Sequence, residues 1–144
     1  DQRFPNQHDG TAAEQVLKFF AYKNNSDAFR GAVTTFLNQY AEQASDNFEY
    51  EKERATFEHA VKFLSTVLDG HFLRKNTSIT PLVQFEACLV AIGQIVDDGK
   101  TPVEPHVDWL NDSELVASST GGTNTRSMLG RRVSRAKDLF SGDV

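Results

Sequence analysis

A chain of 144 residues with 15 Lys and Arg against 20 Asp and Glu carries a formal net charge of −5. This length predicts a single domain over residues 1–144 with a substantial core. The eleven Phe, against three Tyr and one Trp, favour a dry core over a wet binding surface, because Phe has no polar group to satisfy. No apolar run approaches the roughly 18 residues of a membrane span and no leader opens the chain, so we expect a cytoplasmic protein without a membrane anchor.

Helical periodicity predicts three helices in the first half of the chain. The first, at 11–25, opens with a Thr-x-x-Glu capping box, and the second covers 26–40. Gly31 lies inside the second helix, where it weakens the helix and marks a close helix crossing. The third helix runs from about 46 to 68, and Gly70 is the glycine expected just past a helix end.

The second half contains the helix that we expect at the centre of the fold. After a loop at 71–76, a helix near 80–97 is apolar on almost every side, which predicts that neighbouring helices cover it. Cys88 in this helix is the only cysteine, so a disulfide within the chain is excluded, and its apolar neighbours favour packing over catalysis. A weaker helix or helix pair follows around 109–116, and a basic helix with an apolar stripe from Met128 to Phe140 comes last.

Neither an alternating strand pattern nor an internal repeat interrupts this order of elements. We therefore predict an all-α fold, a single bundle of five to seven helices around the central helix near 80–97. The two ends, 1–10 and 141–144, are expected to be frayed.

Residue types that carry catalysis or bind metals form no recognisable motif. The four His are scattered, and no pair has the i, i+4 spacing of a helical metal site. The acidic run at 49–58, which includes Glu53, offers carboxylates for acid–base work or a di-metal site, but its interleaved basic residues favour a solvated face. Asp97 and Asp98 are assigned to a turn, and 99–101 lacks the glycine loop of a nucleotide site. We predict no catalytic residue, no metal and no cofactor.

The end of the chain differs from the rest in charge. From residue 121 onward five Arg and Lys stand against two Asp, so this segment carries +3 and leaves −8 for residues 1–120. Such asymmetry favours an anionic partner, and a helix N-terminus beside an arginine is a plausible phosphate site. The alternative is an ordinary cap with a solvated basic face. The candidate contacts to nucleic acid or another anion are Arg74, Lys75, Asn124, Arg126, Arg131, Arg132 and Arg135.

Several short motifs follow one another in a characteristic order between about residues 12 and 140. They are Val16–Tyr22, Phe29-Arg30-Gly31, Thr35–Tyr40, Phe57–Val61, Phe72–Asn76, Phe85–Val90, Gly122–Arg126 and Arg131-Arg132-Val133. This order resembles the helical C-terminal half of the family catalogued as domain of unknown function 262. Each motif is weak alone, and Leu73 departs from the commonest form of the family's F-R-[KR] loop, so their shared order carries the resemblance.

The resemblance implies the kind of larger protein in which this domain occurs, but no activity for the domain itself. In that family the N-terminal half is a ParB-like domain with a D-G-Q-Q-R motif that is linked to nucleotide hydrolysis. Members include subunits of modification-dependent restriction systems and other phage-defence proteins. This chain has no such motif, so it resembles the helical domain alone, a C-terminal fragment of a larger protein without the family's catalytic residues.

Three hypotheses follow from these observations. The first is a non-enzymatic accessory domain that docks on the ParB-like domain of the same parent protein and contacts DNA through the basic last helix. The second is a protein-interaction or dimerisation bundle with an apolar groove and no nucleic-acid role. The third is a small helical enzyme that uses the acidic run with a metal, and the interleaved charges argue against it.

Overall fold

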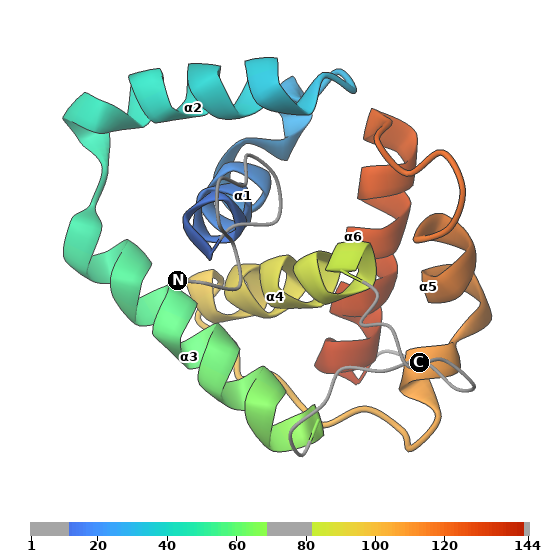
Figure 1. Ribbon diagram of the computed structural model, residues 1–144. Coiled ribbons are helices and arrows are strands. Elements are labelled where there is room, and N and C mark those ends of the chain that lie inside the picture. Colours follow the sequence, from blue (N-terminus) through green and yellow to red (C-terminus); the bar gives the residue numbers. More distant parts are fainter. Residues whose placement is uncertain (1–11, 69–81, 143–144) are drawn as a thin grey trace.

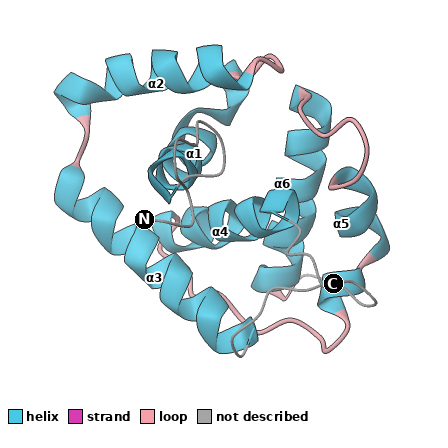
Figure 2. Ribbon diagram, in the orientation of Figure 1, coloured by secondary structure: helices cyan, strands magenta, loops and turns pink. Residues whose placement is uncertain are grey.

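The computed structural model describes residues 12–68 and 82–142, and this part of the chain is helical without a strand (Figures 1 and 2). Six α-helices and two short 3-10 helices follow in the order α1 (Ala12–Asn25), η1 (Ser26–Ala28), α2 (Val33–Asn47), α3 (Tyr50–Leu68), α4 (Leu82–Asp97), η2 (Trp109–Asn111), α5 (Ser113–Ser118) and α6 (Arg126–Ser141). The prediction of an all-α bundle of five to seven helices is confirmed. Within the described ranges, no helix is both long enough and apolar enough to cross a membrane.

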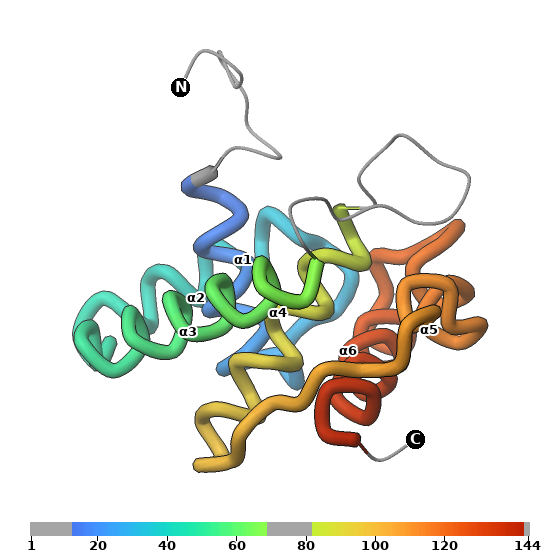
Figure 3. Tube along the Cα trace, turned by 90° about the horizontal axis from the view of Figure 1, so that it is seen from below, coloured from blue at the N-terminus to red at the C-terminus, as the bar shows by residue number. Residues whose placement is uncertain are grey.

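Helix α4 forms the centre of the molecule, as its apolar sequence predicts. It packs against α1, α3 and α6, which surround it in Figures 1 and 3. Every residue from Ala87 to Gly93 is buried. Burial also raises the pKa of the Cys88 thiol, which fits a packing role because a protonated thiol is a poor nucleophile.

Aromatic rings fill the spaces between the helices. Tyr22 of α1 stacks on Phe36 of α2 with ring centroids 5.5 Å apart, and Phe29 meets both rings edge-on. On the other side of α4, the ring of Phe140 from α6 meets that of Trp109 at 5.1 Å. Such edge-to-face pairs add about 0.5–1.5 kcal/mol beyond the burial of their surface. They hold α2 and α6 at fixed positions around the centre.

The predicted second helix is wrong at its start. After η1 the backbone leaves the helical conformation, and α2 begins only at Val33. Gly31 adopts a φ of +99°, and a Cβ atom there would lie 3.0 Å from the backbone oxygen of Asn124. The close approach that we expected at Gly31 is therefore real, but the neighbour is the loop before α6 and the glycine interrupts the helix.

The boundary between the second and third helices also differs from the prediction. α2 continues to Asn47 and α3 starts at Tyr50, with Phe48 in an extended conformation between them. The Phe48 ring packs edge-on against Phe20 of α1 with centroids 5.1 Å apart. This tertiary contact determines where the chain leaves the helical conformation between α2 and α3. The local sequence pattern does not reveal that position. The predicted loop at 71–76, the start of the fourth helix before Leu82 and the end at 1–10 lie outside the described residues.

Candidate functional site

A buried lysine joins three helices at one end of the bundle. The Lys23 side chain of α1 is 0% exposed, and its ammonium group donates to Asn24 Oδ1 at 2.7 Å, to Glu53 Oε1 of α3 at 2.9 Å and to Asp97 of α4. An ammonium group has three N–H donors, and all three are used here. Gly93 lets this side chain pass over α4, because a Cβ atom there would lie 2.9 Å from Lys23 Cδ.

The two carboxylates receive further hydrogen bonds. Asn24 Nδ2 donates to Glu53 Oε2 at 2.8 Å and to the Tyr40 hydroxyl at 3.0 Å, and Thr56 Oγ1 donates to Asp97 Oδ1 at 3.1 Å. Burial raises the pKa of Tyr40. The assignment of Glu53 to a solvated face is therefore wrong, because Glu53 is only 7% exposed and faces its counter-ion. Asp97 likewise pairs with the buried Lys23, and its position at a helix end does not indicate this pairing.

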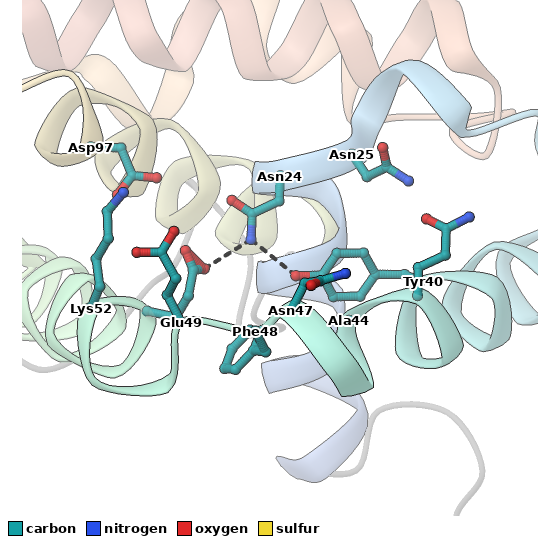
Figure 4. Close-up of a pocket in the computed structure, with 11 residues that line it drawn as sticks. Asn24, Asn25, Tyr40, Ala44, Asn47, Phe48, Glu49, Lys52 and Asp97 are labelled. Atoms are coloured by element: carbon teal, nitrogen blue, oxygen red, sulfur yellow. Dashed lines mark hydrogen bonds between the residues drawn. The ribbon is translucent and has the colours of Figure 1, made fainter.

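A polar cavity of about 330 Å³ opens beside this network (Figure 4). Four amide side chains line it, those of Asn24, Asn25, Gln43 and Asn47, together with Tyr40 and the charged Glu49, Lys52, Glu53 and Asp97. These groups can form hydrogen bonds, but none is an activated nucleophile. In residues 12–68 and 82–142, no group of three His, Cys, Asp or Glu side chains is arranged to hold a metal ion.

A second cavity, of about 220 Å³, is lined almost entirely by carbon. It lies between α1, α3 and α4, and its apolar wall consists of Val16, Phe19, Phe57, Val61, Phe85 and Leu89. Gln15 and Glu86 are the two polar residues of its lining, and the amide atoms of Gln15 are buried. An apolar hollow with a few convergent polar groups is the usual form of a binding site for an apolar group.

The polar groups of this cavity are incompletely paired. Glu86 accepts a hydrogen bond from Lys18 at 3.3 Å, and burial raises the pKa of the Glu86 carboxyl group although Lys18 and Gln15 oppose that shift. The Gln15 amide also favours the ionised Glu86 carboxylate, and the buried amide oxygen of Gln15 accepts no hydrogen bond. A buried amide oxygen without a partner costs free energy.

Most of the α6 arginines that we predicted to bind an external anion instead form hydrogen bonds with other residues of this chain. Arg131 binds Glu114 of α5 through two hydrogen bonds of 3.0 and 2.8 Å. Arg135 binds Asp112 in the same forked manner at 2.9 and 2.7 Å. These hydrogen bonds hold the pKa of both carboxyl groups below its usual range. The acidic stretch at 112–114 was the sequence signal for these pairs.

The other predicted contacts are not gathered into one site. Arg132 is only 2% exposed and donates to the Thr123 backbone oxygen at 2.7 Å, so it holds the loop before α6 and does not face solvent. Asn124 and Arg126 are exposed, with Thr125 between them as the N-cap of α6. Arg74 and Lys75 lie outside the described residues.

Two cavities and one basic helix are thus the features from which a function can be argued. The polar cavity adjoins an ion network whose members bind one another, whereas the second cavity is lined almost entirely by carbon. No family model, curated protein or solved structure matches this chain.

Proposed function

We propose that this chain is a non-enzymatic helical accessory domain that docks on a partner protein through the apolar cavity between α1, α3 and α4. The observation that carries the proposal is the carbon-lined wall of that cavity. Binding partners concentrate their energy in a few anchor side chains that fill such pockets. Filling an apolar hollow of about 220 Å³ supplies that kind of anchor point.

The resemblance to the helical half of domain of unknown function 262 supplies the partner. We propose the ParB-like nucleotidase domain of the same parent protein, in a restriction or phage-defence setting. In such an arrangement the nucleotidase carries the chemistry and this bundle supports or positions it.

Contact with DNA through α6 is the weaker part of the proposal. Arg131 and Arg135 already bind carboxylates, and Arg132 is buried. A phosphate would have to displace these partners, which leaves Arg126 and the exposed cap at Asn124 as the accessible groups. We therefore place protein docking before DNA binding.

The proposal is tested by measuring the affinity of the chain for the ParB-like domain, produced as a separate polypeptide. Val61→Lys puts a charge into the apolar cavity and should weaken binding about thirtyfold, the effect of losing a hot spot of about 2 kcal/mol. The matched control is Val107→Lys, because Val107 is 93% exposed and does not line the cavity. Circular dichroism should show both variants folded.

The salt dependence of binding separates the competing hypotheses. Apolar docking should change little between about 50 and 200 mM salt, whereas DNA binding through Arg126 should weaken about three- to fourfold and be lost in Arg126→Ala. Equal binding by the Val61 and Val107 variants would contradict docking at this cavity. Concentration-dependent dimerisation that only the Val61 change abolishes would identify a second copy as the occupant.

A further inference from the structure

A groove of about 500 Å³ lies between α1 and the corner at which α2 meets α3 (Figure 1). Leu17 and Phe20 of α1 line it together with Ala41 and Ala44 of α2. Among the described residues, Val16 alone lines both this groove and the carbon-lined cavity between α1, α3 and α4. The groove is therefore a separate surface of the molecule.

Three aromatic rings form part of the groove wall. The Phe48 ring meets the rings of Phe20 and Tyr50 edge-on, with centroid distances of 5.1 and 6.2 Å. Tyr50 is 64% exposed although its ring extends this cluster. Aromatic side chains are enriched at the centres of binding surfaces, so the groove offers positions for the apolar side chains of a partner.

The surface around the groove is acidic without exception. Residues 31–51, which include all of α2, contain four Asp and Glu and no Lys, Arg or His, so they carry −4. The four residues are Glu42, Asp46, Glu49 and Glu51. All four are exposed, and none forms an ion pair with a cation in the described part of the chain. An acidic surface without internal counter-ions attracts a basic partner.

The polar cavity continues the groove through three shared lining residues, Tyr40, Ala44 and Phe48 (Figure 4). Three carboxylates and one Lys line the polar cavity, and two of these carboxylates, Glu53 and Asp97, already bind Lys23. Glu49 is the remaining carboxylate, and it follows Phe48 directly in the chain. Glu49 is therefore the group that a cation arriving along the groove can bind.

We propose that this groove and the adjoining edge of the polar cavity bind a basic amphipathic segment of a partner protein, with apolar side chains in the groove and a Lys or Arg at Glu49. This surface is additional to the docking cavity proposed above and does not depend on it. An amphipathic helix that lays its apolar face in a groove is a recurring mode of peptide recognition, with anchors at i, i+3, i+4 and i+7. The charge of −4 selects a basic segment, because an acidic one with the same apolar face is repelled.

The probe is a fluorescent peptide of about 14 residues, with Leu at this helical spacing and Lys elsewhere, whose binding to the whole chain is measured by anisotropy. Replacing its Leu by Ser or its Lys by Glu should each weaken binding at least about tenfold, because the first removes the apolar anchors and the second opposes like charges. No binding of the Leu and Lys probe at about 100 μM chain, or equal binding of the Ser peptide, would overturn the inference.

Paired variants of the chain locate the bound probe. Ala41→Lys puts a cation into the groove and should weaken binding at least about tenfold, whereas Gln39→Lys makes a similar change at an exposed site of α2 outside the groove. Glu49→Gln should weaken binding about threefold and the exposed Glu51→Gln hardly at all. Equal effects within either pair would show general charge attraction and overturn the inference. So would self-association of the chain that Ala41→Lys abolishes, because a second copy would then occupy the groove.

Discussion

Removal of the Lys23 charge should destabilise the fold more than removal of any exposed lysine. Lys23→Met keeps the length of the side chain and leaves Glu53 and Asp97 without their shared counter-ion. Loss of one partner from a buried ion pair costs about 3–5 kcal/mol. We expect the lower end of this range, because the Asp97 side chain is 24% exposed and water can partly solvate it.

Urea denaturation followed by circular dichroism measures this loss, and a cost of about 3 kcal/mol corresponds to a drop of about 10 °C in Tm. The control is Lys52→Met, because Lys52 is exposed at the rim of the polar cavity and its loss should change stability by less than about 0.5 kcal/mol. In a double-mutant cycle with Glu53→Gln, we expect a coupling energy of about 1–3 kcal/mol. A cost below about 1 kcal/mol for Lys23→Met, or additive effects in the cycle, would refute the argument that this network joins α1, α3 and α4.

Three further substitutions test other parts of the fold. Asp112→Asn keeps an N-cap on α5 but removes the ion pair with Arg135, and it should cost about 1 kcal/mol at pH 7. Because Arg135 holds the pKa of Asp112 below the ordinary 3.8, this stabilisation is present above pH 3.8 and is lost as the pH falls through the folded-state pKa. Urea titrations should therefore show the variant and wild type converging only below pH 3.8, and convergence at higher pH would contradict the pairing. Gly31→Ala should cost about 1–3 kcal/mol because of its positive φ and the nearby Asn124 oxygen, whereas Gly130→Ala, with open space around it in α6, should stabilise the fold by about 0.5–1 kcal/mol. Thermal melts of the two variants that move in the same direction would contradict this account.

Local pattern predicted the order of the helices, but neither the boundaries of α2 and α3 nor the charge network. The apolar run at 82–97 predicted the central position of α4, and the structure buries that helix. The acidic run next to Glu53 contains nearby basic residues, which favoured a solvated face, yet its partner is Lys23, 30 residues earlier. Ion pairs between helices depend on the packing angle and the register of those helices, and a single sequence does not contain either.

The burial of Arg132, by contrast, was visible in the sequence. Arg132 lies three residues after Leu129 and four before Ala136, so it shares the face of α6 that packs against the core. Its charge favours contact with an anion, whereas its position on this face favours burial. The helical period is the better guide here, because a long arginine side chain can enter the core when backbone oxygens such as that of Thr123 accept its N–H groups.

The charge asymmetry along the sequence does not persist in three dimensions. Each cation of α6 has a partner supplied by the acidic remainder of the chain or by its backbone: Arg126 with Asp27, Arg131 with Glu114, Arg132 with the Thr123 oxygen, Arg135 with Asp112 and Lys137 with Asp98. The excess of +3 in this segment therefore serves to bind it to a body of charge −8. The Arg126 and Lys137 pairs are exposed and weak, so a nucleic acid can compete for them, but the forked pairs with α5 hold their arginines more firmly. A basic tail in an acidic chain is thus better explained as an intramolecular contact, and the carbon-lined cavity between α1, α3 and α4 becomes the stronger candidate for a binding surface.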